Sequence, residues 1–245
     1  THYRQSAAGL GSHPDYIGLG EDARDEGIAV TFDRYTYPYS GTTPTSGLPH
    51  RAKDGGPERL MAALRAADDR ERMKREITRD RLENNWLTNF KQPQNMQYDG
   101  KLITDIADMR GQDPAETLFD LLIEENLGIS TVGLGTNAQT LYAFVSHPAG
   151  MIASDAILFG EYPNPRTYGC FPIVLAEFVR AEKHLKLPEA IRKMTSFPAQ
   201  RLGLPDRGLL RNGFKADIVI FNPDTVKTHA TKEDPKHYPV GIHYV

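Results

Sequence analysis

The stretch Met151-Ile-Ala-Ser-Asp-Ala-Ile-Leu158 decides how the fold is interpreted. A short apolar run, residues 150–153, leads to a single carboxylate, Asp155, where a loop is expected to begin. In parallel α/β folds, reactive side chains are placed where strands end and loops start. An aspartate there can bind a metal ion or accept a proton from a metal-bound water. The alternative is that Asp155 only caps the following turn, which is a common role of aspartate.

With 245 residues, of which 39% are hydrophobic and 25% charged, the chain has the composition of an ordinary globular protein. Its formal net charge of −3 does not favour nucleic acid or an anionic membrane as a partner. No apolar run approaches the roughly 18 residues that a membrane-spanning helix needs. Cys170 is the single cysteine, which excludes an internal disulfide and predicts a reducing, cytoplasmic location. Its aromatic, glycine-rich surroundings favour a packing role over that of a nucleophile.

Short apolar runs rich in β-branched residues predict buried strands. They are residues 28–32, 129–134 and 151–153, and a further strand is expected within residues 215–221, after a turn-rich hairpin. Apolar stripes at helical spacing predict helices over residues 14–27, 54–90, 103–110, 113–126, 137–145, 171–184, 187–194 and 198–202. The alternation of strands and helices predicts parallel βαβ units, with too few strands before residue 155 to close a barrel.

Two segments do not follow this alternation. Residues 54–90 form a heavily charged helical segment, in which residues 68–81 are interpreted as a solvated helix face with i,i+4 ion pairs rather than as a partner surface. Residues 33–49 form a long loop, and loops of that length are usually functional or disordered. Its tyrosines favour a functional loop. In Asp113-Pro114, proline occupies the first position of a predicted helix.

Four motifs follow one another along the chain. They are residues 151–155, Asn164-Pro-Arg-Thr-Tyr-Gly169, Met194-Thr-Ser-Phe-Pro-Ala-Gln-Arg-Leu-Gly203, and Asp206-Arg-Gly with the later Ala216-Asp-Ile-Val-Ile-Phe221. In this order they resemble the amidohydrolase superfamily and, more narrowly, the D-aminoacylase (N-acyl-D-amino-acid deacylase) family. The resemblance implies an α/β fold in which residues 1–202 form the C-terminal half of a (β/α)8 TIM-like barrel, with a helical insertion at residues 54–90. Residues 203–245 would begin a small β-domain and end in a tail.

The resemblance also implies a metal site. The opening Thr1-His2-Tyr3-Arg4 is similar to the family's Ser-His-x-Lys stretch, whose histidine ligates zinc, so His2 is expected to be a Zn²⁺ ligand. Asp155 falls on the family's catalytic aspartate and is expected to act as general base and acid and as a second metal ligand. Zinc lowers the pKa of a bound water towards ~7, which makes the water nucleophilic. Without the resemblance, His2 would be interpreted as part of a frayed chain end.

A second group of residues is expected to bind the substrate. The loop Tyr37-Pro-Tyr-Ser-Gly-Thr-Thr43 resembles the family's Tyr-Pro-Tyr loop. Arg4, Tyr37 and Thr43 would bind a free α-carboxylate, which needs a cation and hydroxyl donors. Arg166 or Tyr168 would shape the acyl or side-chain pocket. The alternatives are that Tyr37 is a packing aromatic and that Arg166 pairs with a surface acid.

The chain departs from the family pattern at several positions. It contains neither the early His-x-His metal pair nor the Cys or Glu ligand of the first barrel strands, so it is not expected to hold a complete metal site alone. Tyr37 stands where some D-aminoacylases place a second zinc-ligating histidine. Ala156 replaces the usual glycine after Asp155, and Arg4 replaces the lysine. These last differences bear on substrate specificity more than on reaction type.

The expected function is zinc-dependent hydrolysis of the amide bond of an N-acyl amino acid or related amide, with the D configuration favoured. A half-barrel leaves open sheet edges, so a partner chain carrying the N-terminal half is expected, together with further oligomerisation. Cleavage of one precursor before Thr1 would produce both pieces. Two alternatives stay open. One is an N-terminal-nucleophile hydrolase in which Thr1 attacks with its own α-amino group as base, and the other is a metal-free, non-catalytic subunit.

Overall fold

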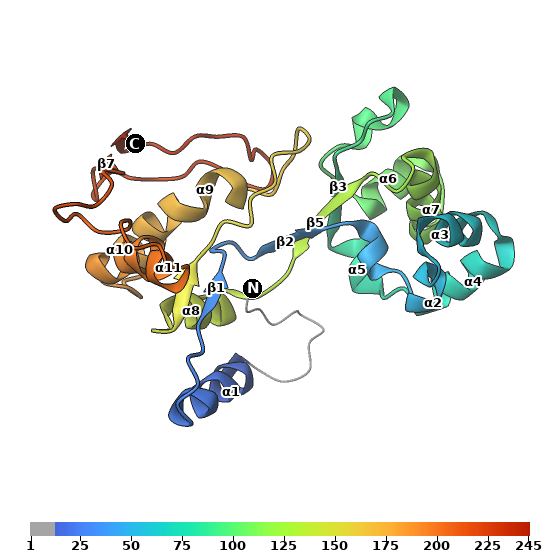
Figure 1. Ribbon diagram of the computed structural model, residues 1–245. Coiled ribbons are helices and arrows are strands. Elements are labelled where there is room, and N and C mark those ends of the chain that lie inside the picture. The colour runs from blue at the N-terminus through green and yellow to red at the C-terminus, as the bar shows by residue number, and fades with distance from the viewer. Residues whose placement is uncertain (1–12) are drawn as a thin grey trace. The chain divides into compact units, whose positions relative to one another are not determined.

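The computed structural model describes residues 13–245, which fall into two compact units. Unit 1 contains the described part of Thr1–Pro38 together with Gly135–Ile157 and Pro165–Val245. Unit 2 contains Tyr39–Leu134 and Leu158–Asn164. Both units mix helices and strands, which agrees with the expected α/β class (Figure 1). The expected division of the chain at residue 202 stays a prediction.

Unit 1 contains a parallel pair of strands, β1 (Phe32–Arg34) and β6 (Gly150–Ile152). Phe32 lies opposite Gly150, and Arg34 lies opposite Ile152. The parallel direction agrees with the sequence pattern, but the strand expected at residues 28–32 is wrong, because β1 begins only at Phe32. Ile28 donates its backbone N–H to the carbonyl of Ala23, so this part of the chain turns locally instead of pairing with a strand.

The helices of unit 1 lie in the described residues before β1 and after unit 2's main segment. They are α1 (His13–Asp25), α8 (Ala138–Ser146), α9 (Arg166–Ile173), the π-helix η3 (Val174–Ala181), α10 (Leu187–Met194) and α11 (Ser196–Arg201). The helix expected at residues 171–184 begins earlier, at Arg166, and continues as η3 after Pro172. Proline has no backbone N–H to donate, so the regular α-helical ladder is interrupted there.

The core of unit 1 joins β1 and β6 to these helices. Its buried side chains include Tyr35, Ile152, Cys170 and Val174, with Phe178 at 1% exposure. α8 and α10 both contact β6, so the strand is enclosed by apolar helix faces. This packing fixes the carboxyl ends of the two parallel strands in unit 1.

The C-terminal part of unit 1 contains a short antiparallel pair, β7 (Ile220–Phe221) and β8 (Ile242–Tyr244). The strand expected at residues 215–221 is therefore confined to its last two residues. Ile218 and Val219 lie outside β7 and are 47% and 52% exposed. Among the described residues, no helix has both the length and the apolar character that crossing a membrane requires.

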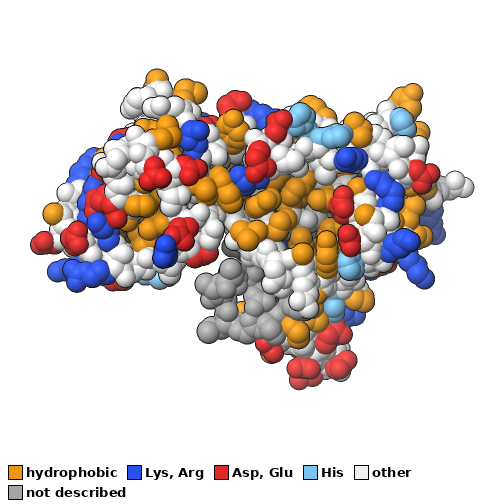
Figure 2. Space-filling view, turned by 180° about the vertical axis from the view of Figure 1, so that it is seen from behind, with side chains coloured by type: hydrophobic (Ala, Val, Ile, Leu, Met, Phe, Trp, Pro, Cys, Tyr) orange, Lys and Arg blue, Asp and Glu red, His pale blue; other side chains and the backbone are white. Residues whose placement is uncertain are grey.

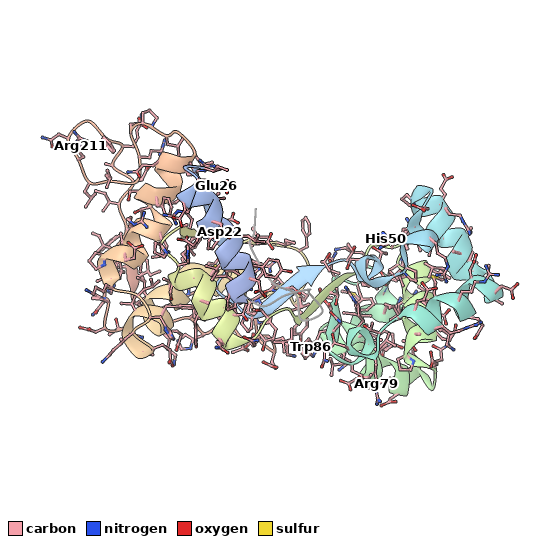
Figure 3. The ribbon with its side chains drawn as sticks, turned by 90° about the horizontal axis from the view of Figure 1, so that it is seen from below. Asp22, Glu26, His50, Arg79, Trp86 and Arg211 are labelled. Carbon is pink, nitrogen blue, oxygen red and sulfur yellow. The ribbon has the colours of Figure 1, made fainter. Side chains whose placement is uncertain are left out.

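The sheet of unit 2 is antiparallel, which corrects the expectation of parallel strands for this part of the chain. Its order is β2 (Tyr39–Thr42), β5 (Ser130–Leu134), β3 (Asn85–Thr88) and β4 (Lys101–Leu102). β2 lies within the segment predicted as a loop, and β3 lies within the segment predicted as helical. Trp86 (Figure 3) enters the sheet because it pairs with Val132, a partner far away in sequence.

Helices and 3-10 turns complete unit 2. They are η1 (Pro44–Gly47), α2 (His50–Lys53), α3 (Gly56–Arg65), α4 (Ala67–Glu76), α5 (Arg79–Glu83), η2 (Pro93–Tyr98), α6 (Ile103–Arg110) and α7 (Pro114–Glu124). α6 has the predicted bounds. The Asp113 side chain accepts the N–H groups of Ala115 and Glu116 at 3.0 and 3.1 Å, which confirms the predicted start of α7.

The charged run in unit 2 is only partly a solvated helix face. Acidic and basic side chains are interspersed over the unit's surface, at the left of Figure 2. Arg79 points outward in Figure 3 and pairs with Glu83 four residues later, as the sequence pattern predicts. Arg70, however, pairs with Glu116 and Asp120 of α7, each at 2.6 Å. The run therefore also joins two helices that are distant in sequence.

Candidate active site at the carboxyl ends of β1 and β6

Asp155 lies just beyond the carboxyl end of β6. The Ala153 N–H donates to the Arg34 carbonyl at 3.1 Å, so the contact between the two strands continues almost to the aspartate. Asp155 has a φ of +47°, in the left-handed region that is unfavourable for residues with a side chain. Its side chain is 37% exposed. The structure thus places the carboxylate where the sequence predicts it, while its catalytic role stays a prediction.

Arg166, the first residue of α9, holds Asp155 at two points. Its Nε donates to the Asp155 backbone carbonyl at 3.0 Å, and its Nη2 donates to the carboxylate. The Arg166 side chain is 1% exposed, whereas the carboxylate that it contacts reaches solvent. Charge-assisted hydrogen bonds of this kind are stronger than neutral ones and fix geometry. The observed contacts of Arg166 therefore orient the candidate catalytic carboxylate.

The ring of Tyr35 supports this arginine. The Cζ atom of Arg166 lies 4.2 Å from the ring centroid, and the Cζ atom of Arg34 lies at the same distance of 4.2 Å. All three side chains are buried, at 1% exposure for each arginine and 2% for Tyr35. A guanidinium this close to an aromatic face is stabilised by the negative face of the ring. The sequence analysis missed Arg34 and Tyr35, which lie in the segment predicted as a loop and which no local sequence signal distinguishes.

Cys170 ties α9 to the end of β6. Its Sγ donates to the Ala153 carbonyl at 3.1 Å, and the Thr36 hydroxyl donates to the Cys170 carbonyl at 2.7 Å. Burial raises the pKa of the Cys170 thiol, which disfavours the reactive thiolate. These contacts agree with the packing role that the sequence favours.

Tyr37 follows β1 and is 5% exposed. Its hydroxyl donates to the Ala230 carbonyl at 3.2 Å and lies 3.4 Å from the Thr228 hydroxyl oxygen. Burial raises the pKa of Tyr37 to about 12. Gly169 packs against this hydroxyl so closely that a Cβ atom at position 169 would overlap it. The observed surroundings match the packing alternative, and the predicted contact of Tyr37 with a substrate stays untested.

The other predicted substrate residues are less closely grouped. Tyr168 on α9 is half-buried and meets the Tyr238 ring edge-on, with centroids 5.5 Å apart. Thr43 belongs to unit 2, where its exposed hydroxyl lies 2.8 Å from the Thr45 hydroxyl. Thr1, His2 and Arg4 lie outside the described residues. Of the predicted site residues, the structure therefore brings Asp155 and Arg166 into direct contact.

The described residues do not make a metal site by themselves. Within residues 13–245, no group of three or more His, Cys, Asp or Glu side chains is placed to hold a metal ion. Asp155 is exposed and could supply one carboxylate ligand, but zinc sites in enzymes use three protein ligands.

Comparison with known proteins decides the family. The model of the amidohydrolase family matches residues 48–242, which is most of the chain. The chain belongs to the amidohydrolase family. This confirms the resemblance carried by the four sequence motifs.

Two proteins similar to this amidohydrolase are an N-acyl-D-aspartate deacylase and a D-aminoacylase. N-acyl-D-aspartate deacylase from Alcaligenes xylosoxydans xylosoxydans is 37% identical over 142 residues, or 55% of this chain and 28% of the relative. D-aminoacylase from the same organism is 44% identical over 95 residues, or 39% of this chain and 20% of the relative. Both similarities are consistent with the narrower resemblance found in the sequence.

A solved structure shows the same fold. The zinc- and phosphonate-bound N-acyl-D-glutamate deacylase from Bordetella bronchiseptica matches with a TM-score of 0.76 and 24% identity. The match covers 99% of this chain and 44% of that chain. The amidohydrolase chain thus spans less than half the length of that protein, and its alignments cover smaller shares of the two relatives above.

Proposed function

We propose that this amidohydrolase chain forms the C-terminal part of a metal-dependent enzyme that hydrolyses the amide bond of N-acyl-D-amino acids. The observation that carries the proposal is Asp155, which lies at the carboxyl ends of two parallel strands and is oriented by a buried arginine. The names of the similar proteins support the substrate class.

The proposed architecture is part of a (β/α)8 barrel. β1 and β6 supply two parallel neighbours, and among the described residues each has a single strand partner. A barrel closes only when every strand has two neighbours, so further parallel strands would flank this pair. We propose that these strands, together with the missing metal ligands, belong to an N-terminal half that joins unit 1.

Asp155 is the proposed general base and acid. A bound Zn²⁺ would supply a polarised, acidic water at this end of the strands. The Asp155 carboxylate would take a proton from the attacking water and later deliver it to the leaving amine. Arg166 would hold the carboxylate in position through both steps, since it bonds the backbone and the side chain of the same residue.

The substrate contacts remain the least defined part of the proposal. We propose that Arg4 binds the α-carboxylate and that Tyr168 borders the acyl or side-chain pocket. Tyr37 could join them only if its hydroxyl exchanged its present contacts with Thr228 and Ala230.

The proposal is tested with the full-length, zinc-loaded protein and N-acetyl-D-aspartate, N-acetyl-D-glutamate and N-acetyl-D-leucine, each with its L counterpart as a control. The expected result is release of the free D-amino acid, loss of turnover on chelation and recovery on adding zinc. In protein cleaved before Thr1, turnover that survives removal of the metal but is lost in Thr1→Ala would support the N-terminal-nucleophile alternative. A folded protein without bound metal or turnover would support the non-catalytic one.

A further inference from the structure

We propose that Tyr35 is a positioning residue of the reaction, because its ring holds the Arg166 guanidinium that in turn orients Asp155. This inference rests on the proposed function of Asp155.

The first step of the argument is the clamp on Asp155. Its backbone is in the left-handed region, at φ +47°, which costs free energy in a residue with a side chain and is retained where the surrounding structure fixes it. Arg166 supplies two such contacts, from Nε to the Asp155 carbonyl at 3.0 Å and from Nη2 to the carboxylate. The direction of the carboxylate therefore depends on the plane in which the Arg166 guanidinium lies.

The second step is what fixes that plane. The Arg166 Cζ atom lies 4.2 Å from the Tyr35 centroid, well inside the roughly 6 Å within which a cation interacts with a ring face. Because Tyr35 is 2% exposed and belongs to the core with Ile152 and Val174, its ring cannot easily turn. A rigid ring face restricts the guanidinium, which would otherwise move among several rotamers.

The third step concerns Arg34. Its Cζ atom also lies 4.2 Å from the Tyr35 centroid, and its backbone is held by strand β1 opposite Ile152. The Tyr35 ring is thus contacted by a buried guanidinium from strand β1 as well as by the one from α9.

A kinetic cycle separates positioning from general stability. Tyr35→Leu removes the ring face and is expected to lower kcat for an N-acyl-D-amino acid about tenfold, with little change in KM. Tyr35→Phe retains the ring and is expected to restore most of kcat. In an Arg166→Gln background, Tyr35→Leu should lower kcat less than about twofold, because the group through which it acts is gone.

Phe178→Leu is the matched control. Phe178 belongs to the same core as Tyr35 but packs edge-on against Tyr142, at 5.2 Å between centroids. It should lower the melting temperature as Tyr35→Leu does and leave kcat within about twofold. Equal losses of kcat in the two Tyr35→Leu backgrounds, or an equal loss in Phe178→Leu, would overturn the inference.

A second readout does not depend on turnover. In the full chain labelled with ¹⁵N, the Arg166 Nε–H resonance should be shifted by the Tyr35 ring and exchange slowly with solvent. Tyr35→Phe should retain that resonance, and Tyr35→Leu should move it and speed its exchange. If the wild-type protein shows the shifted, slowly exchanging resonance but hydrolyses no N-acyl amino acid, the proposed function is wrong, and the contact of Tyr35 with Arg166 is still supported. If the wild-type protein hydrolyses the substrate but Tyr35→Leu leaves the resonance unchanged, the positioning role of Tyr35 is wrong and the proposed function is unaffected.

Discussion

Lys193 on α10 offers a sharp test of the packing beneath β6. Its side chain is fully buried, and its Nζ donates to the carbonyls of His147 and Gly150, the latter at 2.8 Å. The Glu189 carboxylate lies 3.9 Å away. Burial lowers the pKa of Lys193 to about 8. The perturbation is Lys193→Met, which retains the apolar chain length and removes the amine.

The direction in which stability changes with pH follows from the difference in bound protons between the folded and unfolded states. Below pH 8 the amine is protonated in both states, and burying its charge costs stability. Between the folded pKa and the unfolded pKa of about 10.4, the unfolded chain alone holds the proton, so wild-type stability rises with pH. For these two pKa values the rise between pH 7.5 and pH 9.5 is about 2 kcal/mol. Lys193→Met lacks this rise and leaves both carbonyls without their donor at every pH.

The assay is urea unfolding of both proteins at the two pH values. The wild-type advantage over Lys193→Met should grow by about 2 kcal/mol from pH 7.5 to pH 9.5, since other titrating groups cancel in the difference. Lys186→Met, which changes an exposed lysine next to the same helix, is the control and should show no such growth. A constant difference across this range would refute the buried, hydrogen-bonded amine.

Three further predictions concern stability. Tyr37→Phe should lower the free energy of unfolding, measured with urea, by about 1 kcal/mol near neutral pH, because the hydrogen bond to Ala230 is lost. Since the pKa of Tyr37 is raised to about 12, wild-type stability should fall from pH 10 to 12, and Tyr37→Phe should remove this fall. Asp113→Ala should cost about 1 kcal/mol, seen as a lower unfolding midpoint, because α7 loses its N-terminal cap. Gly169→Ala should cost roughly 1–3 kcal/mol, measured by thermal melting, since its Cβ overlaps the Tyr37 hydroxyl. Gly18→Ala, in α1, meets no atom within 4 Å and requires no positive φ, so it serves as the comparison.

Local sequence patterns predicted the helices whose bounds depend on residues close together in the chain. α6 and α10 have the predicted bounds because their apolar spacing is helical, and α7 begins where Asp113 and Pro114 indicate. The strands β2 and β3 were not predictable in this way. Asn85–Thr88 becomes a strand because it pairs with β4 on one side and with β5, more than forty residues later, on the other. Such pairing depends on tertiary contacts rather than on local propensity.

The candidate site, too, was predictable only where local sequence patterns were sufficient. Asp155 could be located from its position after a short apolar run, and Arg166 from its place in a motif. The geometry between them could not, because two residues eleven positions apart meet only after α9 packs on the strand end. Arg34 and Tyr35 could not be predicted from the sequence for the same reason. A buried arginine becomes meaningful only when the ring and the carboxylate around it are known.

The central claim is that Asp155 is the catalytic carboxylate, and the most direct measurement is kcat of Asp155→Asn in the full-length, zinc-loaded protein. Asparagine retains the size of the side chain but cannot take a proton, so kcat should fall by about 10²–10⁴ while the protein stays folded. Asp217→Asn, which changes an exposed carboxylate paired with Arg207, is the matched control and should retain wild-type kcat. Asp155→Asn with kcat close to wild type would contradict the account.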